Sequence, residues 1–170
     1  NFISTSNIID VRETLKKCSE RKEIKAVVLD TLNLFLSYKE YNDRKKLVFD
    51  QWRDIANDII EINTLCNTIL RDDQIAYILG HTELVTDIDG NEMKVLSVIG
   101  KKSKRQPPES FYPIVLMTHV EYNEFGENKY FFTTKPYYSS VKTPLGMFDE
   151  FLIPNSIKYV DNKVREYYKI

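Results

Sequence analysis

The sequence predicts one α/β domain that spans residues 1–170 and is built around a parallel sheet. Two short apolar runs, residues 24–29 and 75–79, have the composition of strands buried on both faces, and such strands belong mainly to parallel sheets. About 45 residues that include a long amphipathic helix separate the two runs, which suits a crossover connection. The length of 170 residues fits one domain that buries about two thirds of its unfolded surface.

The first predicted helix begins after Ser6 or Asn7, either of which can cap it. Apolar residues then recur at helical spacing, at Ile8, Val11, Leu15 and Cys18. This helix leads into the strand at 24–29, so the two elements form half of a βαβ unit.

The middle of the chain is predicted to hold the longest helix and the second strand. Residues 32–46 begin apolar and become polar, and we interpret them as a mobile excursion at the carboxyl edge of the sheet. The helix follows at 49–70, where apolar residues keep to one stripe and charged residues lie largely opposite. The strand at 75–79 then ends in the polar sequence Gly-His-Thr-Glu at 80–83.

The last 80 or so residues favour antiparallel strands and a closing helix. Asp89-Gly90 predicts a turn before a strand at 94–99, and a basic stretch follows at 100–105. Strands at 114–118 and 130–133 flank a polar turn and predict a hairpin. A loop at 142–148 precedes the closing helix, which Asn155 or Ser156 caps. Its predicted buried stripe consists of Ile157, Val160, Val164 and Tyr167.

The composition limits the possible partners and the compartment. The formal net charge is −1, so any nucleic-acid partner must use a local basic patch. Cys18 and Cys66 have no metal-ligand spacing, and we interpret them as reduced core residues of a cytoplasmic protein. The chain has no apolar stretch approaching the ~20 residues that span a bilayer, and no membrane association is expected.

Polar side chains follow both predicted parallel strands where the strands end. Asp30 and Thr31 come directly after the first strand, and His81 and Glu83 follow the second. Open α/β sheets bind ligands at the carboxyl ends of their strands. An aspartate there can hold the Mg²⁺ of a nucleotide through water or a neighbouring hydroxyl, although Asp30 could also simply cap a turn.

The order of these elements resembles the RecA-like branch of P-loop ATPases, and more narrowly the small phage-encoded, RecA-related nucleotide-binding proteins of recombination and single-strand annealing, within the AAA family. The sequence Ala-Val-Val-Leu-Asp-Thr at 26–31 matches a Walker B strand, and Ile-Leu-Gly-His-Thr-Glu at 78–83 matches the next strand with its γ-phosphate sensor. Gly-Lys-Lys at 100–102 and the loop at 142–148 continue the resemblance, which covers residues 8–168. It implies a RecA-like three-layer fold whose parallel central sheet is extended by the antiparallel strands.

The resemblance also implies ATP and Mg²⁺ as cofactors and assigns roles to residues. Asp30 would hold Mg²⁺ through water beside Thr31, His81 would sense the γ-phosphate, and Glu83 could orient the attacking water. Strand-end histidines without any such role are as common.

Two further groups of residues receive roles from the resemblance. Lys142 and Lys135 would reach from a neighbouring protomer into the nucleotide site of a homo-oligomeric ring or filament. A basic loop would contact single-stranded DNA through Lys101, Lys102, Lys104 and Arg105. The alternative for both groups is that these are ordinary solvated lysines and an arginine.

One departure from the family pattern limits the activity of this chain. No G-x-x-x-x-G-K-[ST] motif occurs, and the five glycines do not cluster. We therefore expect the carboxyl-terminal portion of an ATPase, incomplete at its N-terminus and inactive alone, or a descendant that no longer hydrolyses ATP. The first possibility is an ATPase that couples hydrolysis to single-stranded DNA handling in a phage-infected or bacterial cell. The alternatives are a non-catalytic phage structural or interaction module and a nucleic-acid-binding domain without hydrolysis.

Overall fold

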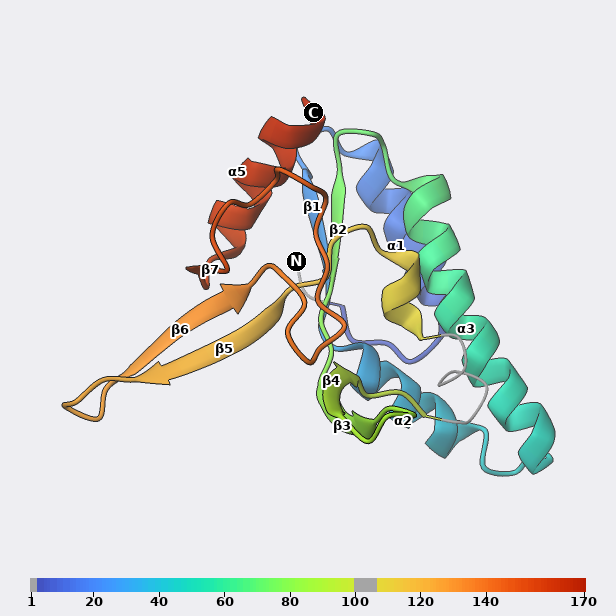
Figure 1. The fold of residues 1–170 in the computed structure, drawn as a ribbon. Coiled ribbons are helices and arrows are strands. Elements are labelled where there is room, and N and C mark those ends of the chain that lie inside the picture. Colours follow the sequence, from blue (N-terminus) through green and yellow to red (C-terminus); the bar gives the residue numbers. More distant parts are fainter. Residues whose placement is uncertain (1–2, 100–106) are drawn as a thin grey trace. The chain divides into compact units, whose positions relative to one another are not determined.

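The computed structural model describes residues 3–99 and 107–170 and has a mixed α/β fold with small parallel and antiparallel sheets. The chain divides into two compact units. Unit 1 comprises Asn1–Glu83 and Leu96–Pro108, and unit 2 comprises Leu84–Val95 and Glu109–Ile170. Figure 1 shows the elements of both units.

The described part of unit 1 contains three α-helices and a pair of parallel strands. The helices are α1 (Ile8–Glu20), α2 (Leu32–Asn42) and α3 (Val48–Ile69), and the strands are β1 (Ala26–Leu29) and β2 (Ile75–Ile78). The strands pair in register from Ala26 opposite Ile75 to Leu29 opposite Ile78. The prediction that the two apolar runs are parallel neighbours is therefore confirmed.

The core of unit 1 lies between the helices and one face of this strand pair. Its buried members come from all three helices: Val11, Leu15, Leu32, Phe35, Leu36, Ile55, Ile59, Ile62 and Leu65. Val27 and Leu29 of β1 and Ile78 of β2 pack against this cluster. Val28 is 55% exposed, so the prediction that β1 is buried on both faces is wrong for this residue. An apolar run shows that a strand suits burial, but whether the second face is covered depends on elements far along the chain.

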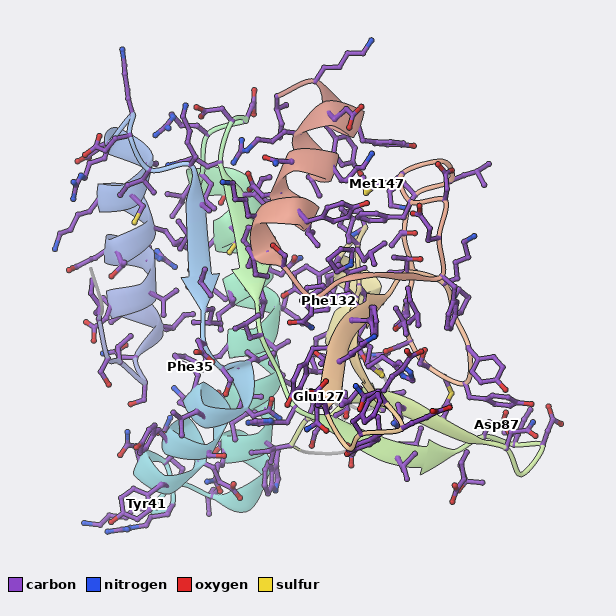
Figure 2. The ribbon with its side chains drawn as sticks, turned by 90° about the vertical axis from the view of Figure 1, so that its left-hand side faces the viewer. Phe35, Tyr41, Asp87, Glu127, Phe132 and Met147 are labelled. Carbon is purple, nitrogen blue, oxygen red and sulfur yellow. The ribbon has the colours of Figure 1, made fainter. Side chains whose placement is uncertain are left out.

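The excursion predicted at 32–46 is instead largely helical, because α2 fills most of it. Thr31 caps this helix, and its side chain accepts a hydrogen bond from the Leu34 amide. Leu32, Phe35 and Leu36 are buried at helical spacing, and Phe35 is marked in Figure 2. Tertiary packing explains the difference, since a short helix gains most of its stability from its buried face.

Salt bridges join α2 to α3 beside this core. Lys39 of α2 lies 3.2 Å from the Asp58 carboxylate of α3 and 3.5 Å from that of Asp43. Burial raises the pKa of Asp58, and the charge of Lys39 opposes the rise. Lys39 therefore offsets part of the cost of placing a carboxylate between the helices.

A hairpin follows β2. It consists of β3 (Thr82–Thr86) and β4 (Glu92–Leu96), and Asp87 organises the turn by accepting hydrogen bonds from the amides of Asp89 and Asn91. Gly90 has φ +85°, as the predicted turn requires. The turn is confirmed, β4 lies slightly earlier than the predicted 94–99, and the polar residues after β2 enter a strand that was not predicted.

Unit 2 contains a three-stranded antiparallel sheet. Its strands are β5 (Met117–Tyr122), β6 (Asn128–Thr133) and β7 (Leu152–Pro154), in the order β5-β6-β7, and a short 3₁₀ helix (η1, Pro108–Phe111) comes before them. The predicted hairpin is confirmed, although β5 begins three residues later than expected. Extension of the parallel pair by these strands stays a prediction.

The closing helix α5 spans Ile157–Tyr168 and starts as predicted. Ser156 caps it by accepting a hydrogen bond from the Tyr159 amide. Val160 and Val164 are buried, whereas Ile157 and Tyr167 remain 44% and 41% exposed. Among the described helices, none is both long and apolar enough to cross a bilayer.

Candidate functional site

The candidate site lies at the carboxyl edge of β1 and β2. The two strand ends stay hydrogen-bonded past the strands themselves, because the Leu79 amide donates to the Leu29 carbonyl at 3.0 Å and the Leu32 amide donates to the Leu79 carbonyl at 2.9 Å. These bonds bring Asp30 and Thr31 beside Gly80 and His81. The edge therefore gathers residues that lie some 50 positions apart in the sequence, as expected for parallel strands.

Asp30 and Thr31 occupy the junction between β1 and α2. The peptide bond between them is cis. Asp30 is exposed, and no residue in the described ranges forms a hydrogen bond or ion pair with its carboxylate. Thr31 is half-buried, and its hydroxyl oxygen accepts a hydrogen bond from the Leu34 amide at 3.2 Å as the cap of α2. With respect to the described residues, the pair thus presents an unpaired carboxylate beside a hydroxyl whose own proton remains available to donate.

Asn33 connects three segments at this edge. Its side-chain oxygen accepts a hydrogen bond from the His81 amide at 2.7 Å, and its side-chain nitrogen donates to the Ser97 carbonyl at 2.8 Å. The Ser97 amide in turn donates to the His81 carbonyl at 2.8 Å. The backbone of His81 is therefore held on both sides, whereas the His81 side chain is exposed.

A side chain at position 80 would require the Leu96 side chain to move. A Cβ atom there would lie 2.2 Å from Leu96 Cδ1 and 3.1 Å from the side-chain oxygen of Asn33. The lack of a side chain lets β2 pass close to the residues that hold His81. Sequence reasoning missed the roles of Asn33 and Ser97, because both act over long range and neither belongs to a recognisable motif.

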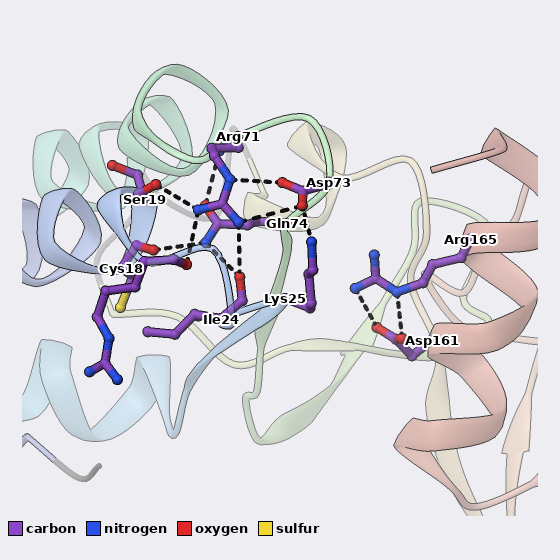
Figure 3. Close-up of polar contacts among 10 residues, drawn as sticks. Cys18, Ser19, Ile24, Lys25, Arg71, Asp73, Gln74, Asp161 and Arg165 are labelled. Carbon is purple, nitrogen blue, oxygen red and sulfur yellow. Dashed lines mark hydrogen bonds and ion pairs between the residues drawn. The ribbon is translucent and has the colours of Figure 1, made fainter.

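A second polar cluster lies at the opposite, amino-terminal edge of the strand pair (Figure 3). The Arg71 guanidinium donates to the carbonyls of Ser19 at 2.6 Å, Arg21 at 3.1 Å and Ile24 at 3.2 Å. Gln74 Nε2 donates to the carbonyls of Cys18 and Ile24, each at 2.9 Å. These donors bind carbonyls of the last turn of α1 and of the turn that follows it, and they fix the connection into β1.

Asp73 orients Arg71 within this amino-terminal cluster. Its carboxylate accepts a hydrogen bond from Arg71 Nε at 2.9 Å and is also paired with the Lys25 ammonium. The hydrogen bonds from Lys25 and Arg71 lower the pKa of Asp73 to about 2. Every polar group here has a structural partner, so the cluster stabilises the fold rather than forming a ligand site.

The other predicted site residues belong to other elements of the chain. Glu83 is half-buried in β3 of unit 1. In unit 2, Lys135 donates to the Asp149 carbonyl at 2.7 Å, and the Lys142 ammonium lies 3.5 Å from the Ser110 carbonyl. The backbone of Lys142 pairs with Val115, which fixes this part of the loop.

The four predicted DNA-contacting residues, Lys101, Lys102, Lys104 and Arg105, lie outside the described residues. Within residues 3–99 and 107–170, no group of three or more His, Cys, Asp or Glu side chains is arranged to hold a metal ion. A cation at Asp30 would therefore need water or a ligand to complete its coordination.

Comparison of this sequence and structure with protein-family models, curated proteins and solved structures gave no match.

Proposed function

We propose that this chain is part of a phage-type RecA-like ATPase that couples ATP binding and hydrolysis to the handling of single-stranded DNA. The observation that carries the proposal is the parallel pair β1–β2, which places two exposed side chains, Asp30 and His81, at one edge of a sheet. Asp30 has no partner among residues 3–99 and 107–170. A Walker B carboxylate and a γ-phosphate sensor stand in this relation on adjacent strands of RecA-like proteins.

The proposed fold is the RecA-like three-layer arrangement, with β1 and β2 in a larger sheet that antiparallel strands extend. Helices cover both faces of such a sheet. The exposed side chain of Val28 supports the proposal, because an apolar residue on the second face of β1 suits a face that another element covers.

The side chains at the edge suit a Mg²⁺–ATP complex. The Asp30 carboxylate would hold Mg²⁺ through water, since Mg²⁺ prefers oxygen ligands and usually keeps several waters. Thr31 offers a hydroxyl beside it, and Glu83 would orient water. His81 would contact the γ-phosphate, and Asn33 would fix the backbone from which the imidazole projects. When bound, Mg²⁺ supplies charge neutralisation at the phosphates.

Affinity for the phosphates has to come from residues that this sequence does not contain. No G-x-x-x-x-G-K-[ST] motif occurs among the 170 residues, and in P-loop proteins the backbone amides and lysine of that motif provide most of the phosphate contacts. We therefore expect the isolated chain to bind ATP poorly. Calorimetry that finds magnesium-dependent, micromolar binding to it would contradict this account of the site.

The decisive experiment is Asp30→Asn in the protein that contains this chain together with a phosphate-binding loop. ATP hydrolysis should be lost while the circular dichroism spectrum and thermal midpoint stay unchanged. Asp72→Asn is the matched control, because Asp72 is also exposed, belongs to unit 1 and lies before β2 rather than after it. Full hydrolysis in the Asp30 variant would refute the proposal, and a protein with no ATP binding at all would favour the non-catalytic module.

The DNA part of the proposal depends on the basic loop. Replacing Lys101, Lys102, Lys104 and Arg105 with alanine should weaken binding to all single strands alike. Each lost phosphate contact should also reduce the salt dependence by a slope of about 0.7. If the affinity for single-stranded DNA and its salt dependence were both unchanged, these four residues would not contact DNA.

Lys142 and Lys135 are proposed to act across a protomer interface. Lys142→Ala should lower turnover far more than ATP affinity, because a trans-acting cation stabilises the transition state rather than bound ATP. Mixing it with the Asp30→Asn protein should restore part of the activity, since some interfaces then combine intact residues from both chains. Lys158→Ala, at an exposed position of α5, is the control. No recovery in mixed assemblies would exclude the trans role.

A further inference from the structure

Helix α2 is apolar on two faces, only one of which is buried. Leu32, Phe35 and Leu36 face the core. On the other side, Leu34, Tyr38 and Tyr41 follow one another at helical spacing and are 51%, 51% and 62% exposed. Figure 2 shows Tyr41 near the end of the helix. Exposed apolar side chains that gather on one face of a helix are suited to contact with a partner.

The end of α2 adds positive charge to this outer face. Arg44 lies over the Tyr41 ring, 4.2 Å from its centroid, and Lys45 is exposed with no ion pair to any described residue. Leu47, which follows them, is 77% exposed. We call Leu34, Tyr38, Tyr41, Arg44 and Lys45 the α2 surface. It is an apolar strip with a basic border.

The turn between β5 and β6 has the complementary chemistry. Phe125 stands in this turn and is 89% exposed, with the exposed carboxylates of Glu124 and Glu127 on either side. β7 pairs with Phe131–Thr133 only, so the hairpin is two-stranded where it approaches the turn. Figure 1 shows it as a long ribbon with the turn at its end. We call residues 123–127 the hairpin tip.

Hydrogen bonds fix the conformation of the hairpin tip. The Asn123 side-chain oxygen accepts from the amides of Phe125 at 3.0 Å and Glu127 at 2.8 Å. The Asn123 side-chain nitrogen donates to the Glu127 carboxylate at 2.9 Å, and the Gly126 amide donates to the Asn123 carbonyl at 3.0 Å. Phe125 is therefore presented on a rigid turn. Such an aromatic anchor loses little conformational entropy when it binds.

We propose that the hairpin tip of one copy of this chain docks on the α2 surface of a second copy. Phe125 would pack on the strip formed by Leu34, Tyr38 and Tyr41, and Glu124 would lie near Lys45. The argument is charge complementarity, because one surface is acidic around an aromatic residue and the other is basic beside apolar residues. The contact joins two different patches, so it is head-to-tail and generates a ring or a filament.

This contact rests on the proposed function, because it would form the homo-oligomer proposed there. It would also connect the interface between copies to the candidate site. Thr31 caps α2 and Asn33 lies in its first turn, so a neighbouring copy would contact the helix that positions the candidate site. Association of the chain without ATP or DNA tests the contact alone. Its failure is therefore distinguishable from loss of hydrolysis in the Asp30 variant.

The test is sedimentation velocity of the full chain over a range of concentrations at low salt. Lys45→Glu and Glu124→Lys should each weaken self-association about tenfold or more, because each makes the facing charges alike. Equimolar mixing of the two variants should restore association, since each contact between unlike variants then joins opposite charges. The same two changes in one chain should restore it as well. Glu13→Lys, at an exposed position of α1, should have no effect.

Three results would overturn the proposal. The first is a wild-type chain that is monomeric at every concentration. The second is a Lys45→Glu variant that binds oligothymidine more weakly but associates normally, which would assign the α2 surface to nucleic acid. The third result comes from a cross-linking experiment with benzoylphenylalanine at position 125, in a mixture of two isotopically distinct copies. Cross-links only within one chain would refute the contact, whereas cross-links to α2 between copies would support it.

Discussion

Removal of the Asn33 side chain should loosen the edge at which the candidate site lies. Asn33→Ala deletes two hydrogen bonds, from the His81 amide at 2.7 Å and to the Ser97 carbonyl at 2.8 Å. The bond to Ser97 is partly buried and the bond from His81 is exposed. A typical intramolecular hydrogen bond contributes about 1 kcal/mol net. The free energy of unfolding should therefore fall by about 2 kcal/mol. For a chain of this size, that corresponds to a thermal midpoint lower by about 4–8 °C.

The assay for Asn33→Ala combines urea denaturation with amide hydrogen exchange. Exchange at the His81 amide should accelerate more than exchange at the Ile55 amide in the middle of α3, because the lost acceptor protected His81 directly. Asn57→Ala is the control, since Asn57 is exposed on α3 and forms no side-chain hydrogen bond with any described residue. A loss below about 0.5 kcal/mol together with unchanged exchange at His81 would refute the assigned role of Asn33.

Three further outcomes are expected. Hydrogen bonds from Lys25 and Arg71 lower the pKa of Asp73 from 3.8 to about 2, so its contribution to stability should be complete above about pH 4 and disappear as the pH falls through 2. Asp73→Asn should flatten an acid titration of stability over that interval. Burial raises the pKa of the Cys66 thiol to about 11, so its alkylation at pH 8 should be slow in the folded chain and fast in urea. Thr31→Ala should cost about 1 kcal/mol through loss of the α2 cap, and Thr31→Ser should restore it, as urea midpoints would show.

Local patterns were sufficient to predict the elements with one clear apolar stripe. The spacing of Val11 and Leu15 and the cap at Asn7 define α1, and the stripe of α3 is equally regular. The parallel pairing of β1 and β2 followed from the length of the connection between them. These predictions depended on spacing and chain length, which are visible in one sequence.

The remaining parts of unit 1 depended on tertiary contacts. α2 has apolar residues on two faces, so its pattern lacks the contrast of an amphipathic helix, and only the Thr31 cap signalled its start. Val28 suits a buried strand but is exposed, because coverage of its face depends on distant elements.

Only part of the candidate site could be predicted, because some of its contacts are long-range. Asp30 and His81 follow the ends of β1 and β2, as the sequence predicted. Asn33 forms hydrogen bonds with His81 and Ser97, which lie 48 and 64 positions further along the chain. A local sequence pattern does not predict contacts at such separations.

The cluster around Arg71 bears on where this chain could be divided. Arg71 binds the carbonyls of Ser19 and Arg21 on one side of the turn at 22–23, and that of Ile24 on the other. Lys22 and Glu23 are exposed between them. A tryptic cut after Lys22 would therefore leave both new ends attached to the same guanidinium, with α1 still packed through Val11 and Leu15. The peptide that carries α1 should co-elute with the rest of the chain, which makes this turn a natural position for split-protein reconstitution.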